Sequence, residues 1–143
     1  MNFLKINGAH GEGGGQIVRS AITLSCITNQ PIHLENIRKN RKNEGLKPQH
    51  LTAIKILKKI SNAKVIGDTL GSTELKFIPG EIKNLELNED VKTAGSISLI
   101  LQVLIPAVSI SQKKTKFDNK RRYWRNVESN NELYKICTER SIF

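Results

Sequence analysis

The sequence predicts an α+β fold with α/β-like layers. Short stretches with the alternating apolar pattern of strands are interleaved along the chain with longer stretches of helical periodicity. The length of 143 residues and the apolar fraction of 38% suit one globular domain with a single core. Together these observations predict the element order βαβαββ, followed by the beginning of a second βα unit.

The first part of the chain divides into a strand, a helix and a second strand. Residues 3–6 and 31–37 have strand-like patterns, and residues 16–27 between them have helical periodicity. We expect the core face of this helix to carry the apolar residues that recur at helical spacing, Ile17, Ala21 and Leu24. A polar, basic loop over residues 38–47 follows the second strand.

A second helix is expected from Pro48, because proline suits the first turn of a helix. Its apolar stripe comprises Leu51, Ile54, Leu57 and Ile60. Further strands are expected at residues 63–66, 74–78 and 85–87. The helix that begins near Thr93 is apolar on nearly every face, which predicts burial between layers. Gln102 interrupts its apolar run, so we expect a buried amide that needs a hydrogen-bond partner.

Basic residues are unevenly distributed along the chain. The net charge is +10, and the last 31 residues carry half of it, together with five of the seven aromatic residues. A strongly basic chain suits polyanions such as RNA or DNA. The composition changes so abruptly near Lys113 that residues 113–143 look like a segment of different origin.

Cysteine usage and the apolar runs bear on the compartment. Cys26 and Cys137 are too few for a disulfide framework, which favours a reducing compartment. The N-terminus has no signal-peptide pattern, and the longest apolar run, over residues 97–110, is too short to span a membrane. We therefore expect a cytoplasmic protein without membrane contact.

The segment GEGGGQIVRS, residues 11–20, places a glycine-rich turn ahead of the first helix. Glycines permit close approach of the backbone, and a helix N-terminus presents unpaired N–H groups, so this turn suits a phosphate. Glu12 opposes this, since a carboxylate repels phosphate unless a metal ion or an arginine stands between them. A tight turn without a ligand is the alternative.

The basic loop and the start of the second helix hold the other candidates. Arg38 and Arg41 are three residues apart and can converge on one anion through their planar guanidinium groups, although a solvated basic loop is the alternative. His50 shares a helix flank with Ile54 and Leu57, which places it at the edge of the core. A satisfied structural histidine is common at such a position.

Three blocks taken together resemble the RNA 3'-terminal phosphate cyclases over residues 3–112. They are GEGGGQIVRS at 11–20, IRKNRKNEGLKPQHL at 37–51 and TAGSISLILQ at 93–102. The resemblance implies βαβαββ repeats similar to the C-terminal domain of translation initiation factor three. It implies one complete repeat over residues 1–80, about half of a second over 81–112, and a basic tail outside the family pattern over 113–143.

The resemblance also implies an activity. The family converts the 3'-phosphate of RNA to a 2',3'-cyclic phosphate with ATP and a divalent metal, Mg or Mn. Carried over by position, the catalytic residues are Glu12, Arg19 and His50, with Glu12 also the metal ligand. The RNA-phosphate or anion-binding residues are Arg38, Arg41 and Gln49. The nucleotide-binding residues are Gln102, Gly13 and Gly14.

The chain also departs from the family pattern. The histidine that the family adenylates lies near its C-terminus, and none of His10, His33 and His50 matches its position. We therefore expect a truncated, catalytically incomplete cyclase. The tail is expected to be frameshifted or disordered. The frameshift is a hypothesis, in which plausible codons for residues 119–131, read one nucleotide later, restore a family-like glycine and Ser-Pro pattern.

An alternative function uses the same basic residues without catalysis. The basic loop and the tail suit a small RNA-binding or ribosome-assembly module. One and a half repeats would also leave strand edges uncovered, which predicts self-association.

Overall fold

The structure is a computed structural model that describes residues 2–83, 86–88, 94–111, 115–119 and 123–127, with side chains described over 2–83 and 98–110. The expectations for Thr93, for Cys137 and for most of the basic tail lie outside these residues.

The first six elements confirm the predicted order βαβαββ. They are β1 (Leu4–Asn7), α1 (Gly15–Thr28), β2 (Ile32–Glu35), α2 (Pro48–Ile60), β3 (Lys64–Ile66) and β4 (Leu75–Ile78). The following elements are β5 (Glu86–Asn88), α3 (Ala94–Ser111), β6 (Thr115–Asn119) and β7 (Tyr123–Val127). The fold is therefore mixed α+β, and the specific likeness to the initiation-factor domain stays a prediction.

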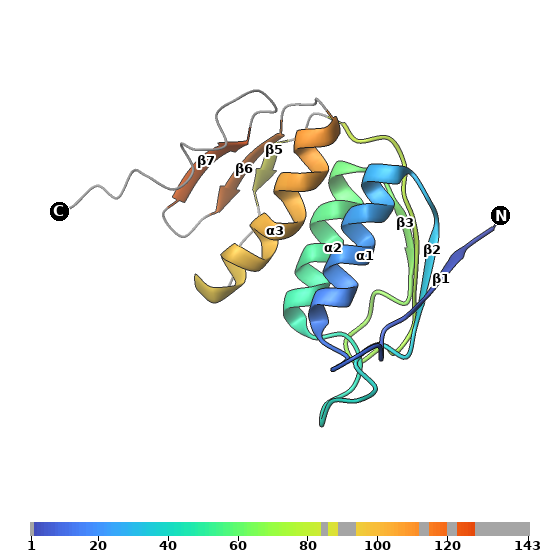
Figure 1. The fold of residues 1–143 in the computed structure, drawn as a ribbon. Coiled ribbons are helices and arrows are strands. Elements are labelled where there is room, and N and C mark those ends of the chain that lie inside the picture. The colour runs from blue at the N-terminus through green and yellow to red at the C-terminus, as the bar shows by residue number, and fades with distance from the viewer. Residues whose placement is uncertain (1, 84–85, 89–93, 112–114, 120–122, 128–143) are drawn as a thin grey trace.

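The first sheet has the strand order β1-β2-β4-β3. Strands β1 and β2 are parallel, whereas β4 pairs antiparallel with both β2 and β3. Alternation along the central strands gives the sheet two faces. The inward face buries Ile32, Leu34, Leu75 and Phe77, and α1 and α2 cover this face (Figure 1).

The second sheet repeats part of this arrangement. Strands β5 and β6 are parallel and flank α3 in sequence, as β1 and β2 flank α1. Strand β7 then pairs antiparallel with β6. Figure 1 shows this sheet beside α3, on the side away from the first sheet. The second sheet thus resembles the first in its β5-α3-β6 part, and the division of the chain into one complete repeat and the beginning of a second stays a prediction.

The helices form the middle of the molecule. Helix α1 packs against α2 and α3, and all three contribute buried apolar side chains to one core. The turn between β1 and α1 and the loop between β2 and α2 lie at the same end of this layer, the lower end in Figure 1. The N-termini of α1 and α2 therefore meet at that end.

The predicted core face of α1 is right for Ala21, which is buried, and for Ile17, which packs against the core, but it is wrong for Leu24. Leu24 is 57% exposed, and the buried residues are Val18, Ala21, Ile22, Thr23, Ser25 and Cys26. The two buried hydroxyl groups carry little desolvation cost because they are hydrogen-bonded. Thr23 donates to the carbonyl of Arg19 at 2.8 Å, and Ser25 donates to the carbonyl of Gln30 at 2.6 Å.

The predicted full burial of α3, and of Gln102 on it, is also wrong. Ser98, Gln102 and Ile110 are exposed, and the buried face comprises Ile100, Val103, Leu104, Ala107 and Val108. Gln102 interrupts the apolar run because it lies on the open side of the helix. Among the described residues, no helix is long and apolar enough to cross a membrane.

The corrected core face of α1 gives a testable difference between two aliphatic residues two positions apart. Ile22 is fully buried, so Ile22→Ala should lower the free energy of unfolding by about 2–5 kcal/mol. Leu24→Ala, the matched control, should change it by no more than about 0.5 kcal/mol. Urea denaturation followed by circular dichroism measures both; equal losses would contradict the observed orientation of α1.

Candidate functional site

The glycine turn brings the start of α1 to the lower end of the fold without a capping side chain. Gly11 and Gly13 have φ angles of 57° and 59°, a region that favours glycine. Gly14 is the N-cap of α1 and makes no side-chain cap hydrogen bond, and the first turn holds no acidic residue. The helix N-terminus is therefore suited to an anion from outside the helix.

His50 lies in the first turn of α2 and is completely buried. Its Nδ1 accepts a hydrogen bond from the backbone N–H of Lys47 at 3.0 Å. An imidazole nitrogen that accepts a hydrogen bond carries no hydrogen, so the neutral ring carries its proton on Nε2. This Nε2–H group is buried and has no hydrogen-bond partner among the described residues.

Gly15 explains why the imidazole fits where it does. A Cβ atom added to Gly15 would collide with Nε2 of His50 and with the neighbouring ring carbons. The N-terminus of α1 therefore lies directly against the unpartnered Nε2–H group. Only glycine permits this contact at the first residue of α1.

Two arginines bring positive charge to the same place. The Nε atoms of Arg19 on α1 and Arg38 in the β2–α2 loop are buried and, within the described chain, have no hydrogen-bond partner. The pKa of His50 is lowered to about 4, chiefly by burial and then by the charges of Arg38, Arg19 and Lys47, in that order of size. Burial also lowers the pKa of Arg19. His50 is therefore neutral at physiological pH.

The backbone of the β2–α2 loop aims Arg38 inward. Asn36 and Arg38 have φ angles of 55° and 58°, which are uncommon for residues other than glycine and are frequent at functional sites. Backbone hydrogen bonds from Lys39 to Asn36 and from Arg41 to Arg38 close two successive turns. The loop thus has a defined backbone, while residues 39–44 are exposed to solvent.

The glycine turn and the basic loop are joined by side chains. Arg41 Nη2 lies 2.9 Å from Glu12 Oε2, and Asn40 Nδ2 donates to the carbonyl of Ala9 at 2.9 Å. The sequence left open whether a metal ion or an arginine stands beside Glu12, and the structure places Arg41 there. Asn40 was not a candidate, because nothing local in the sequence indicates a contact across about 30 positions.

Of the predicted nucleotide residues, Gln102 lines a groove that adjoins the arginine cluster, whereas Gly13 and Gly14 are not among its lining residues. Gln102 on α3 faces α1 across a groove of about 480 Å³. Its lining residues are Gln16, Arg19, Ser20, Thr23, Leu24, Ile27, Leu99, Gln102 and Pro106. Arg19 therefore belongs both to the groove and to the surroundings of His50. Gln49 is exposed on the first turn of α2.

Metal binding is the remaining role that the sequence predicts for Glu12. Nowhere in the described part do three or more His, Cys, Asp or Glu side chains gather as metal ligands would. Glu12, the predicted ligand, is paired with Arg41. The described residues thus do not fit a protein-held metal, and a metal ligand role for Glu12 stays a prediction.

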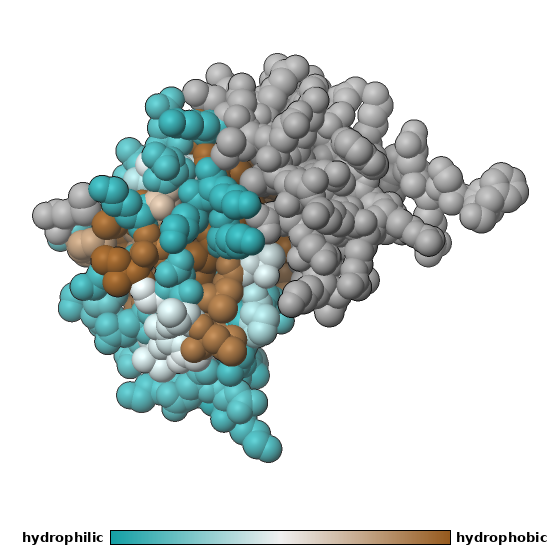
Figure 2. Space-filling view, turned by 180° about the vertical axis from the view of Figure 1, so that it is seen from behind, coloured by the Kyte–Doolittle hydropathy of each residue, from teal (hydrophilic) through white to brown (hydrophobic). Residues whose placement is uncertain are grey.

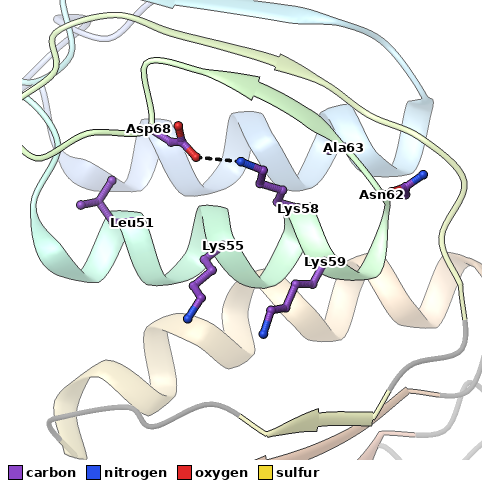
Figure 3. Close-up of a pocket in the computed structure, with 7 residues that line it drawn as sticks. All are labelled: Leu51, Lys55, Lys58, Lys59, Asn62, Ala63 and Asp68. Carbon is purple, nitrogen blue, oxygen red and sulfur yellow. Dashed lines mark hydrogen bonds and ion pairs between the residues drawn. The ribbon is translucent and has the colours of Figure 1, made fainter.

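A second concavity lies on the other flank of α2 and contains none of the predicted site residues. It is lined by Leu51, Lys55, Lys58, Lys59, Asn62, Ala63 and Asp68. Figure 3 shows Lys58 turned toward Asp68, with which it forms an ion pair of 3.1 Å, while Lys55 and Lys59 project from the opposite edge of the helix. The site around His50 differs from this concavity because it contains buried donors without hydrogen-bond partners among the residues that the structure describes, on Arg19, Arg38 and His50.

Comparison with known proteins identifies relatives over most of the chain. The family model described as RNA 3'-terminal phosphate cyclase matches residues 10–119. The RNA 3'-terminal phosphate cyclase of Pyrococcus furiosus is 54% identical over 112 residues, which cover 78% of this chain and 33% of that protein. The protein of the same name from Thermococcus kodakarensis is 52% identical over 109 residues, 76% and 32% of the two chains. The chain spans about a third of the length of these relatives.

Substitution of Gly15 tests whether the α1 terminus and His50 form one site. Gly15→Ala should lower the free energy of unfolding by about 1–3 kcal/mol because its methyl group collides with the imidazole. It should also abolish the rise in melting temperature that inorganic sulfate gives the unaltered chain. Gly14→Ala is the matched control, since its added Cβ meets only the backbone N of Gln16, at 3.9 Å. Sulfate stabilisation of Gly15→Ala equal to that of the unaltered chain would contradict this site.

The lowered pKa of His50 predicts a pH dependence of stability. The folded pKa of about 4 is below the ordinary value of 6.5, so the unfolded chain takes up the proton first as pH falls. The free energy of unfolding is therefore unaffected by the titration of His50 above pH 6.5. Between pH 6.5 and about 4 it falls by ~3 kcal/mol in the absence of anions, because the unfolded chain is protonated at His50 and the folded chain is not. His50→Gln, whose amide can also accept the Lys47 N–H bond, should lack this loss. Urea titrations across this range measure it, and identical profiles would be inconsistent with a neutral buried imidazole.

Proposed function

Because the chain belongs to the RNA 3'-terminal phosphate cyclase family, we propose that it binds the 3'-phosphate end of RNA and takes part in the ATP-dependent formation of a 2',3'-cyclic phosphate. The observation that carries this proposal is the cluster of three buried, unpartnered nitrogens, Arg19 Nε, Arg38 Nε and His50 Nε2. Each is a donor, and an unpaired buried donor costs about 1–3 kcal/mol unless a ligand satisfies it.

A phosphate monoester is the ligand that fits this donor set. Its three terminal oxygens can accept hydrogen bonds from both guanidinium groups and from the imidazole N–H at the same time. Its double negative charge is favoured by the two arginines and by the N-terminus of α1. A phosphodiester within the RNA chain carries less charge and has fewer free oxygens, so the site favours the chain end.

His50 acts in this proposal as a hydrogen-bond donor. Its Nδ1 lone pair is used by the Lys47 N–H group, and its Nε2 carries the proton, so neither nitrogen has a lone pair for nucleophilic attack. The low pKa of about 4 keeps the ring neutral, which avoids a third buried charge beside Arg19 and Arg38. The role is to hold the phosphate rather than to be modified.

Glu12 and Arg41 form the rim of the proposed site. Their ion pair is exposed, with 87% of the Glu12 side chain and 42% of the Arg41 side chain accessible. An exposed pair is worth about 0–1 kcal/mol, so Arg41 can exchange its carboxylate partner for a phosphate at low cost. Gln49, exposed on the first turn of α2, is proposed as a further phosphate contact.

The groove between α1 and α3 is proposed as the nucleotide site. Its volume of about 480 Å³ is within the usual range for small-molecule sites, and its lining combines Gln102 with apolar side chains such as Leu99 and Pro106. Gly13 and Gly14 precede α1 in the glycine turn and are proposed as further nucleotide contacts at the N-terminus of this helix, of which Gly14 is the N-cap. ATP would activate the RNA 3'-phosphate by transfer of its AMP group with loss of pyrophosphate, and AMP would leave when the 2'-hydroxyl closes the ring. We derive no step through a divalent metal, because the described residues do not fit one.

Removal of one pocket donor should weaken binding of the phosphorylated end selectively. Arg38→Gln and Arg19→Gln should each lower the affinity for a short RNA with a 3'-phosphate by roughly 10- to 100-fold, the loss of a charge-assisted hydrogen bond. Affinity for the same RNA with a 3'-hydroxyl should change little. Lys64→Gln, an exposed lysine on β3, is the control for loss of charge alone. Fluorescence anisotropy measures these affinities.

Turnover separates catalysis from binding in the same proteins. Labelled ATP, a divalent metal and 3'-phosphorylated RNA are incubated with the full chain, and cyclic-phosphate product is measured. Product that depends on Arg38 supports the cyclase. Salt-dependent RNA binding with no preference for a 3'-phosphate and no product would favour the noncatalytic RNA-binding module instead.

A further inference from the structure

The β2–α2 loop carries two lysines that the phosphate pocket does not use. Lys39 and Lys42 alternate in sequence with Arg38 and Arg41, and both are exposed. Over residues 38–47 the loop holds five basic residues and one acidic residue, Glu44. Figure 2 shows hydrophilic side chains over the lower end of the molecule, where Figure 1 places this loop.

The loop holds these lysines in place beside the pocket. At its base, backbone hydrogen bonds of 2.9 Å join Ile37 to Thr73, Gly45 to Ile37 and Leu46 to Ser72. At its tip, Asn40 is bonded to the glycine turn, which also forms the pocket rim. A charged surface on a fixed loop loses less conformational entropy when it binds a partner than one on a free loop.

The charges of Lys39 and Lys42 are available to a partner. In the described part of the chain, neither lysine takes part in an ion pair, and the nearest acidic candidate in the turn, Glu12, is occupied by Arg41. An uncompensated basic surface next to a site for a polymer end is suited to the rest of that polymer.

We propose that Lys39 and Lys42 form a second contact surface, which binds the phosphodiester backbone of RNA upstream of its 3' end. The inference rests on the proposed function, in which the terminal phosphate occupies the pocket and the chain must leave it past the rim. The surface reads no base, because lysine ammonium groups contact phosphates as point charges. It therefore gives affinity for RNA length rather than for sequence.

The double variant Lys39→Gln/Lys42→Gln tests this surface. The matched control is Lys64→Gln/Lys83→Gln, which removes the same charge from exposed lysines at the other end of α2. The backbone N–H of Lys83 bonds the carbonyl of Ile60, the last residue of this helix, and α2 is about 20 Å long. Each full chain is titrated with a fluorescent RNA of about 12 nucleotides, a usual length for a single-strand site.

We expect the lysine variant to lose affinity for the RNA backbone, whatever group the RNA carries at its 3' end. For Lys39→Gln/Lys42→Gln, binding should be about tenfold weaker, and the slope of log affinity against log salt should fall by about 1.4. These changes should be equal for RNA ending in a 3'-phosphate and in a 3'-hydroxyl. The affinity of a dinucleotide with a 3'-phosphate, measured by its competition with the fluorescent RNA, should be unchanged. Such a dinucleotide occupies only the pocket and does not reach the two lysines.

The outcomes separate this inference from the proposed function. If the lysine variant has the same affinity and salt slope as the control variant, the surface is refuted, whatever the pocket binds. If the unaltered chain shows no preference for a 3'-phosphate, the proposed function fails, yet the salt slope still decides whether the lysines contact RNA. If the lysine variant loses only competition by the dinucleotide, the lysines belong to the pocket and the inference is wrong.

Discussion

The contact between Gly15 and the imidazole of His50 is the constraint on which the rest of the site depends. It sets the spacing between the N-termini of α1 and α2, because any side chain at Gly15 would collide with the ring. It also directs the Nε2–H group at the start of α1, since the Lys47 N–H group fixes the ring through Nδ1. The two loops that carry Arg38 and Glu12 lead into these helices, so their positions follow from the same contact.

Most of the fold could be predicted because strands and helices leave a local pattern, yet the orientation of α1 could not. Two sets of residues compete for its core face, and the observed set includes Thr23 and Ser25, which are polar. Their hydroxyl groups are satisfied by the carbonyls of Arg19 and Gln30. The polar side chains are therefore tolerated in the core, and Leu24 is left outside. A sequence pattern cannot anticipate such compensation.

The candidate site, like the fold, could be predicted from the sequence only in part. Arginines, a histidine and a glycine turn are visible in the sequence as residue types, and the family resemblance places them in one pocket. Their pairings are long-range and are visible only in the structure. Arg41 stands beside Glu12, and Asn40 closes the loop onto Ala9. Gln102 shows the limit of pattern reasoning, since a polar residue in an apolar run marked the open side of α3 rather than a buried amide.

Electrostatics explains why His50 is neutral beside Arg19 and Arg38. A charged imidazole would repel both guanidinium groups in a region of low dielectric, and burial already disfavours its charged form. The neutral ring still offers one N–H donor, so the pocket keeps three donors with two charges. Without a ligand these donors are unsatisfied and costly, which lowers the stability of the empty state. In the proposed function, an anion with several acceptors would remove that cost on binding, so the same buried donors would provide both affinity for a phosphate and its coupling to the stability of the fold.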